Sequence, residues 1–286
     1  MTKEAGHSDD RSVLVVNGTG KTGRRVVEGL RARGVPVRVG SRAGHPPVRL
    51  GGLGYLARRA AGDGRRVRLL LPDLAVPGAA ETIAAFSKLA VDNGTRRLVL
   101  LSGRGEDEAQ RSEEALARSG ADWTVLRSSW FMQNFSESYF LEPLLGGELA
   151  LPADRIPEPF VDADDVAEVA VAALTDDRHV GEIYELTGPR LLRFDEAVAE
   201  ISGASEREIR YVPLTIEQFA AGMAEANVPD DVLSLLGFLF TEVLDGRNAH
   251  LEDGVERALG RPARDFSDFA RKLAAAGVWH GCEVAA

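Results

Sequence analysis

The chain has 286 residues, of which 44% are hydrophobic and 27% charged, enough for one full-sized α/β domain and a smaller appendage. No run approaches the roughly 18 to 20 apolar residues of a membrane-spanning helix. The polar segment 1–10 lacks the apolar stretch typical of a signal peptide, and we expect it to be a disordered arm. The single cysteine, Cys282, excludes an internal disulfide, so we expect a cytoplasmic protein with no membrane partner.

The net charge of −10 argues against nucleic acid as a partner, because nucleic-acid binders usually carry a basic face. The charge is unevenly distributed, since the first 72 residues hold fifteen Lys or Arg and only five Asp or Glu. This basic part suits a phosphorylated cofactor, and it equally describes a solvated surface.

Strands and helices alternate in the first half of the chain. Short apolar runs predict buried strands at 12–17, 35–40, 67–71, 96–102 and 122–127. Apolar residues at helical spacing predict helices at 24–33, 79–93 and 106–119, with glycines at their ends. This alternation predicts an α/β fold with a doubly wound parallel sheet.

After Arg127 the pattern changes. Residues 128–151 are aromatic-rich and irregular, and a helix at 162–174 follows, with Asp162 or Asp164 as its N-cap. A strand at 181–186 comes next, and the rest is mostly helical apart from a short strand at 209–212. We predict that 11–128 and 160–190 form the sheet domain, and that 129–159 and 191–286 form a smaller, mostly helical region on the substrate side.

A glycine-rich loop follows the first predicted strand: Gly18-Thr19-Gly20-Lys21-Thr22-Gly23. It is a G-x-G-x-x-G between a buried strand and a helix, which predicts pyrophosphate binding at the helix N-terminus. A P-loop is excluded because the glycine that it needs five residues before Gly20 is Val15. The sheet domain is therefore predicted to be an NAD(P)-binding Rossmann domain.

The second strand ends in Gly40-Ser41-Arg42, without the acidic residue that binds the ribose 2′-hydroxyl of NAD. Ser41 and Arg42 suit a 2′-phosphate, because a guanidinium matches phosphate geometry. We predict NADP(H) as the cofactor. The alternative for Arg42 is a solvent-exposed side chain without a ligand.

Catalytic side chains are not evident. None of the four tyrosines has a lysine four residues later, so the Tyr-x-x-x-Lys pair of short-chain dehydrogenases is missing, and we predict no metal site. The histidines (His7, His45, His179, His250, His280) are expected at the surface. Any chemistry would be hydride transfer by the cofactor, oriented by the protein.

Motifs along most of the chain resemble the NmrA-like branch of the atypical short-chain dehydrogenases. They are the glycine loop, Leu98-Val99-Leu100-Leu101-Ser102, Trp123-Thr124-Val125-Leu126-Arg127, Trp130-Phe131-Met132-Gln133-Asn134-Phe135, Pro159-Phe160-Val161-Asp162 with Asp164-Asp165-Val166-Ala167, Tyr184-Glu185-Leu186-Thr187-Gly188-Pro189, and Gly260-Arg261-Pro262 with Asp265-Phe266. Pro72-Asp73-Leu74 and Ser136-Glu137 bring the chain closest to the festuclavine/agroclavine dehydrogenase group and its bacterial relatives.

The resemblance implies an NADPH-dependent reductase of quinones, iminium ions or similar electron-poor substrates. It places Leu71 and Ser102 beside the cofactor, with Ser102 as a weak catalytic candidate, and Trp130, Phe131 and Asn134 in the substrate pocket. The alternative for the aromatic residues is plain core packing. Some NmrA-like relatives only sense NADP and regulate a partner protein, which is the second functional hypothesis. An epimerase ranks last, because those enzymes normally keep the Tyr-x-x-x-Lys pair.

The segment from His45 to Leu71 departs from the family, with six arginines and one aspartate. One interpretation is translation out of frame over part of the segment, and the other is a divergent Arg-rich surface helix at 53–61. The sequence leaves a monomer or a homodimer open, because the apolar stripe of 229–245 suits either the core or a dimer face.

Overall fold

The computed structural model describes residues 12–40, 68–71, 78–153, 155–226, 228 and 230–280. The predicted arm 1–10, Ser41, Arg42, the Arg-rich segment up to residue 67 and Cys282 lie outside the described residues. The chain divides into two compact units. Unit 1 comprises Met1–Ser102, Asp107–Leu126 and Ala167–Ile183, and unit 2 comprises Gly103–Glu106, Arg127–Val166 and Tyr184–Ala286.

Six strands form the main sheet, in the order β2-β1-β3-β4-β5-β7. Their bounds are β1 Val13–Val16, β2 Val37–Gly40, β3 Arg68–Leu71, β4 Arg97–Gly103, β5 Asp122–Ser128 and β7 Ile183–Leu186. β1 pairs in parallel with β2 on one side and with β3 on the other, and β3 pairs in parallel with β4. β3 thus occupies the place of the fourth strand in a Rossmann sheet, as predicted for 67–71.

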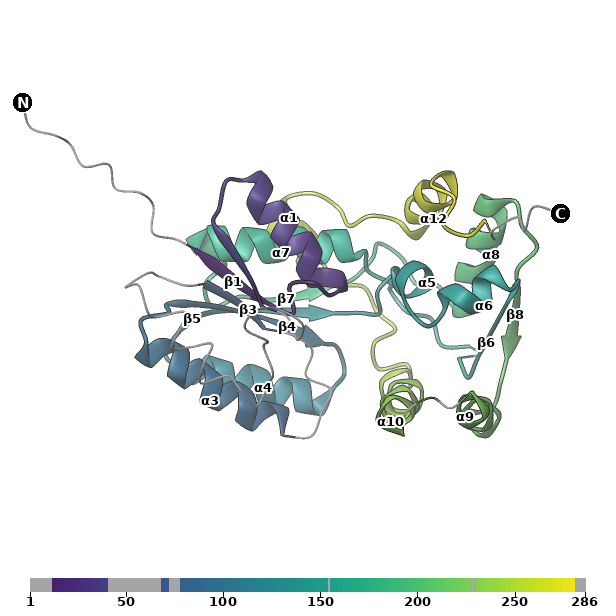
Figure 1. Cartoon of the computed structure of the whole chain (residues 1–286), viewed down its shortest axis with the longest axis horizontal. Helices are drawn as coiled ribbons and strands as arrows, with labels where there is room; N and C mark the ends of the chain where they lie inside the picture. The colour runs from purple at the N-terminus through teal and green to yellow at the C-terminus, as the bar shows by residue number, and fades with distance from the viewer. Residues whose placement is uncertain are drawn as a thin grey trace, which may run out of the picture. The chain divides into compact units, whose positions relative to one another are not determined.

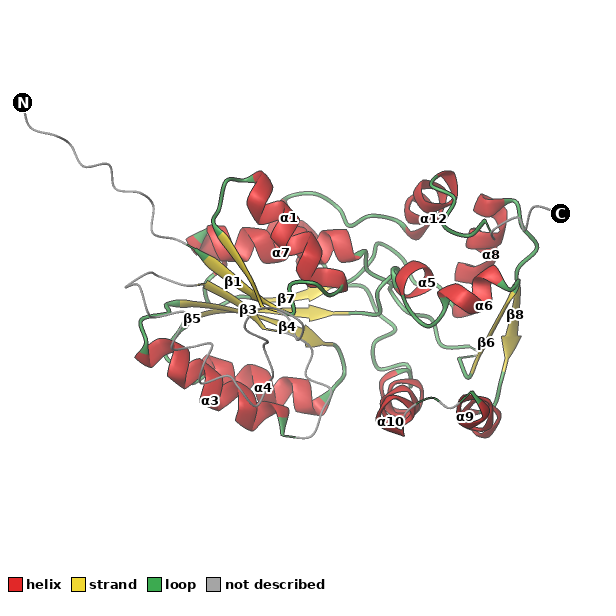
Figure 2. Ribbon diagram, in the orientation of Figure 1, coloured by secondary structure: helices red, strands yellow, loops and turns green. Residues whose placement is uncertain are grey.

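Helices cover both faces of the sheet (Figures 1 and 2). α1 (Lys21–Ala32) and α7 (Ala163–Thr175) lie on one face, and α3 (Ala79–Asp92) and α4 (Asp107–Ala117) on the other. Apolar strand residues such as Leu14, Leu98 and Leu100 pack against Ile83 and Phe86 of α3. The predicted doubly wound α/β fold is confirmed, because both faces of the parallel sheet are buried.

Unit 2 holds most of the shorter elements. They are α5 (Asn134–Glu137), α6 (Leu141–Leu145), β6 (Glu148–Leu151), α8 (Phe194–Ser205), β8 (Arg210–Pro213), α9 (Ile216–Glu225), α10 (Asp230–Phe238), a π-helical turn Leu239–Val243, α11 (Gly254–Leu259) and α12 (Phe266–Ala275). β6 pairs in parallel with β8. The expectation of an irregular 128–151 was wrong, because two short helices and β6 form there.

An aromatic cluster forms the core of unit 2. The ring of Phe135 lies 5.4–6.0 Å from the rings of four phenylalanines: Phe140, Phe160, Phe194 and Phe266. Edge-to-face pairs of this kind add stability beyond the area that they bury. Phe240 and Leu244 join this core, so part of the apolar stripe of 229–245 is core. The fully buried Trp279 donates an Nε1–H hydrogen bond of 2.9 Å to the Phe135 carbonyl.

Two aspartates of the Pro159–Asp165 segment, Asp162 and Asp165, make a helix cap and ion pairs at the beginning of α7. Asp162 caps the helix, since its Oδ1 accepts a 2.8 Å hydrogen bond from the Asp164 amide, which confirms the predicted cap. Gln133 bridges the same cap by donating to Asp162 and accepting from the Ala163 amide, both at 2.7 Å. Asp165 is fully buried and pairs with Arg261, at 2.7 Å, and with Arg264.

We expect Gly23→Ala to destabilise the protein by about 2–3 kcal/mol, in the range for overpacked sites. A Cβ on Gly23 would lie 2.2 Å from the Asn17 carbonyl oxygen, where α1 meets the turn after β1. Chemical denaturation measures the loss. The matched control is Gly203→Ala, at an exposed position of α8 with no atom near the added Cβ, which we expect to stabilise by up to about 1 kcal/mol. Equal stability of the two variants would contradict this prediction.

Candidate functional site

The predicted phosphate loop is a tight turn between β1 and α1. Asn17 adopts a left-handed conformation with φ of 55°. The Gly18 amide then donates to the Gly40 carbonyl and the Gly20 amide to the Asn17 carbonyl, each at 2.9 Å. Gly20 is the N-cap of α1, and the first turn of this helix carries no acidic side chain. The positive end of the helix dipole is therefore open to an anion.

Each glycine of the loop has a close neighbour. A Cβ on Gly18 would lie 3.0 Å from the Val15 carbonyl oxygen, and one on Gly20 would lie 2.9 Å from Nδ2 of the Asn17 side chain. Thr19 is exposed and Gly20 and Lys21 are partly exposed, whereas Thr22 and Gly23 are buried. The loop thus fits a pyrophosphate at Thr19–Lys21, while Gly23 allows the helix to pack closely on the strand.

Of the other predicted cofactor residues, Leu71 is the last residue of β3, paired with Leu100 of β4. Ser102 lies near the carboxyl end of β4 and is 5% exposed. Its hydroxyl donates a 2.5 Å hydrogen bond to Glu113 of α4, which is also buried. Ser102 is therefore held by a carboxylate within unit 1.

The predicted substrate residues lie together in unit 2. Trp130, Phe131 and Asn134 are each partly buried, and Asn134 begins α5. The Trp130 ring lies 5.4 Å from the rings of both Phe194 and Phe240. Trp130 therefore packs on the aromatic core while part of its surface stays accessible.

A buried arginine that the sequence analysis missed organises the polar interior of unit 2. Arg104 follows β4 and its side chain is 2% exposed. Its Nε donates to Glu185 at 3.1 Å, and Nη1 to the Ser129 hydroxyl at 3.1 Å and the Asn248 and His250 carbonyls at 3.3 and 3.4 Å. Nη2 lies 2.8 Å from His250 Nε2. One guanidinium thus joins residues of β7, the end of β5 and the segment 248–250.

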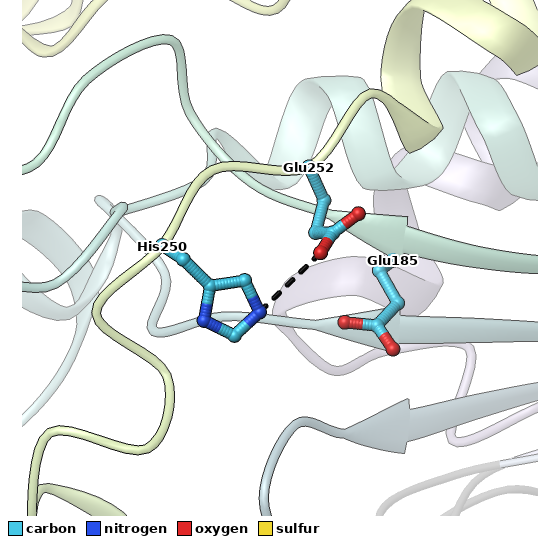
Figure 3. Close-up of side chains that lie close together, drawn as sticks. All are labelled: Glu185, His250 and Glu252. Carbon is cyan, nitrogen blue, oxygen red and sulfur yellow. Dashed lines mark ion pairs between the residues drawn. The ribbon is translucent and has the colours of Figure 1, made fainter.

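Figure 3 shows Glu185, His250 and Glu252, whose ligand atoms lie within 4.8 Å of one another. Metal binding is opposed by the arginines around them. Arg104 and Arg127 hold the two Glu185 oxygens at 3.1 and 2.7 Å, and Arg104 points an N–H at His250 Nε2. Because an arginine N–H can only donate, that nitrogen accepts, and its 3.3 Å contact with Glu252 is not a hydrogen bond in this state. We interpret Glu185 as part of an ion-pair network with Arg104 and Arg127, and His250 as a hydrogen-bond acceptor of Arg104.

Glu158 is the second polar group that sequence reasoning missed. Its side chain is fully buried, and neither carboxyl oxygen has a hydrogen-bond partner among the described residues. Burial raises the pKa of Glu158 from 4.5 to about 7, against the opposing effect of the Arg104 charge. No motif signalled it, because a single glutamate between two prolines looks like an ordinary surface turn.

The histidines divide between surface and interior. His250 and His280 are exposed, and His7 and His45 lie outside the described residues. The expectation of a surface position was wrong for His179, which is 1% exposed in the 3-10 turn Asp177–His179. Burial and the neighbouring Arg178 lower the pKa of His179, and its carbonyl accepts a 2.7 Å hydrogen bond from Thr124.

Two relatives align with almost the whole chain. The NAD(P)H azoreductase of Xenophilus azovorans is 31% identical over 284 residues, covering 92% of this chain and 98% of the relative. The agroclavine dehydrogenase of Claviceps fusiformis is 28% identical, covering 90% and 96%. No model of a protein family matches the chain.

Solved structures match the fold at low sequence identity. The Citrobacter sp. triphenylmethane reductase complexed with NADP(H) has a TM-score of 0.73 at 19% identity, covering 92% of this chain and 99% of that one. The quinone oxidoreductase of Escherichia coli complexed with NADPH has a TM-score of 0.72 at 19% identity, covering 91% and 99%. None of the described helices combines the length and apolarity that a bilayer crossing requires.

We expect the stability cost of Glu158 to depend on pH. The pKa of Glu158 is about 7 in the folded protein and about 4.5 in the unfolded chain. Between pH 4.5 and pH 7 the native protein therefore keeps a proton that the unfolded chain has lost. The contribution of Glu158 to the unfolding free energy therefore falls as pH rises through this window and is constant above it.

Glu158→Gln removes this titration. Between pH 5.5 and pH 8 its stability relative to wild type should rise by about 2 kcal/mol, measured by urea denaturation at both pH values. The control is Glu142→Gln, which removes one carboxyl from the exposed surface of α6. A difference between Glu158→Gln and wild type that is the same at both pH values would contradict the prediction.

Proposed function

The chain belongs to the NmrA-like branch of the atypical short-chain dehydrogenases/reductases, and on this premise we propose that it is an NADPH-dependent reductase of small, electron-poor organic acceptors. The observation that carries the proposal is the phosphate loop, where exposed or partly exposed backbone at Thr19–Lys21 lies at the N-terminus of α1, whose first turn has no acidic side chain. We assign cofactor binding to unit 1 and acceptor binding to unit 2.

The preference for NADPH over NADH rests on Ser41 and Arg42 at the end of the second strand, where NAD-selective folds carry an acidic residue. Two further observations support it. The compared triphenylmethane reductase and quinone oxidoreductase were solved with NADP(H) and NADPH. The sequence before residue 72 is also strongly basic, which favours a cofactor with an additional phosphate.

When bound, NADPH supplies the hydride, and the side chains of the protein orient the reactants. Thr19, Gly20 and Lys21 would hold the pyrophosphate, with Leu71 and Ser102 farther along the same carboxyl edge of the parallel sheet. The Ser102 hydroxyl is held by Glu113, which fixes its orientation. A positioning role therefore suits Ser102 better than proton transfer.

The acceptor site is assigned to Trp130, Phe131 and Asn134. Trp130 is partly exposed and its ring packs against Phe194 and Phe240, and an aromatic residue of this kind suits stacking on a flat, conjugated acceptor. The relatives are named for an azo compound and for agroclavine, so the fold leaves the choice of acceptor to the pocket residues. We propose quinones and iminium ions as the acceptor classes, with the protein acting as a monomer or homodimer.

A non-catalytic NADP sensor that binds a partner protein is the second candidate. The absence of a tyrosine with a lysine four residues later is compatible with this sensor as well as with the reductase. Both candidates require NADP binding, so turnover distinguishes them.

We expect the purified protein to oxidise NADPH in the presence of a small quinone or an N-alkyl iminium ion. Nicotinamide absorbance follows the reaction, and the reduced acceptor is identified by mass. Tight NADPH binding without turnover across a broad panel of both acceptor classes would contradict the reductase and favour the sensor.

We expect Arg42→Ala to weaken NADPH binding by about 10- to 100-fold and to leave NADH binding nearly constant, because a charged hydrogen bond contributes about 1.5–3 kcal/mol. Nicotinamide fluorescence measures both affinities. Arg31→Ala is the matched control, since it removes an exposed arginine from the last turn of α1. An equal loss for both cofactors in Arg42→Ala would contradict the assignment to the 2′-phosphate.

A further inference from the structure

The carboxyl group of Glu158 stands out because the protein gives it no hydrogen-bond partner. Its side chain is 0% exposed, and both oxygens lack a partner among the described residues. A buried carboxylate without partners is strongly disfavoured, so burial favours the neutral acid. A neutral acid has a proton to give.

The backbone around Glu158 is fixed on both sides. Its amide donates to the Leu192 carbonyl at 2.9 Å, and its carbonyl accepts from the Leu192 amide at 3.0 Å. Pro157 and Pro159 flank it and restrict the backbone further. The carboxyl group is therefore held in place by rigid chain.

This segment runs beside the residues assigned to the acceptor. Three residues after Glu158, the Val161 amide donates to the Trp130 carbonyl and the Val161 carbonyl accepts from the Met132 amide, each at 2.9 Å. Phe131 and Val161 form a parallel bridge. Glu158 thus belongs to the chain that supports Trp130 and Phe131 within unit 2.

The charged group that acts on Glu158 is Arg104, and each of the three side-chain nitrogens of Arg104 contacts another residue. Glu185, Ser129, His250 and the Asn248 carbonyl surround its guanidinium. The positive charge of Arg104 therefore stabilises the carboxylate of Glu158 without an ion pair between the two side chains. Burial outweighs that charge and raises the pKa of Glu158 to about 7, so the acid titrates near neutral pH.

We propose that Glu158 is the proton donor for acceptors that become anions on reduction. This inference rests on the proposed reductase function. It assigns to Glu158 the proton donation that the Tyr-x-x-x-Lys pair performs in the short-chain dehydrogenases that have this pair.

The proton requirement depends on the charge of the acceptor. Hydride transfer from NADPH to a quinone places two electrons and one proton on it and leaves a hydroquinone monoanion. Glu158 protonates that oxygen, becomes a carboxylate, and takes a proton back from water. Hydride addition to an iminium carbon instead neutralises its positive charge and gives the amine directly, so no proton is needed.

The test compares two acceptors in one preparation of the full-length protein. Menadione is the neutral acceptor, and N-methyl-3,4-dihydroisoquinolinium is the cationic one. We expect Glu158→Gln to lower the ratio of menadione turnover to iminium turnover by about 100-fold, the lower range for a positioned general acid. Glu142→Gln, at an exposed position of α6, should keep the wild-type ratio.

The wild-type enzyme supplies a second measurement that needs no variant. The ratio of menadione turnover to iminium turnover should decline as pH rises through about 7, because Glu158 then loses its proton. A flat ratio between pH 5.5 and pH 8.5 would overturn the proposal even where Glu158→Gln fails to fold.

The outcomes distinguish a failure of the proton-donor role of Glu158 from a failure of the proposed reductase function. Equal losses with both acceptors in Glu158→Gln would show a purely structural glutamate and leave the reductase intact. Wild-type protein that binds NADPH but reduces neither acceptor would overturn the reductase, and the proton donor with it.

Discussion

A single buried positive charge organises the polar interior of unit 2. Arg104 connects Glu185 of β7, Ser129 after β5 and the segment around His250, which are far apart in the sequence. Burying a guanidinium is unfavourable unless its donors are paired, so these partners must come together for unit 2 to fold. The same arginine contacts both Glu185 and His250, two of the three side chains whose ligand atoms lie within 4.8 Å of one another.

The charge of Arg104 also acts on Glu158. The nitrogens of Arg104 contact other residues, and its charge lowers the pKa of Glu158 although no hydrogen bond joins the two side chains. Glu113, another buried glutamate, instead accepts the Ser102 hydroxyl. The contrast suits two tasks, since a partnered carboxylate fixes a neighbour and an unpartnered acid can release a proton.

The geometry of the phosphate loop depends on backbone atoms, whereas the polar network in the interior of unit 2 is made mainly by side chains. The loop depends on the close approach of α1 to Asn17, which only glycine at position 23 permits. Other residues of the family motifs have structural roles, since Asp162 caps α7 and Asp165 pairs with Arg261 and Arg264. A motif residue is therefore assigned to chemistry only after its contacts are known.

The order of strands and helices, the phosphate loop and the cap at Asp162 could be read from the sequence, because each depends on neighbouring residues and their periodicity. The short helices of 134–145, the burial of His179, the partners of Arg104 and the isolation of Glu158 could not. Each of these depends on which distant segments pack against one residue, and burial alone changes a polar side chain from a solvated group into an ion pair or a neutral acid. The sequence by itself thus determined the α/β sheet and the loop for a dinucleotide. The tertiary structure alone decided which buried charges are paired and which carboxyl group has its pKa raised by burial.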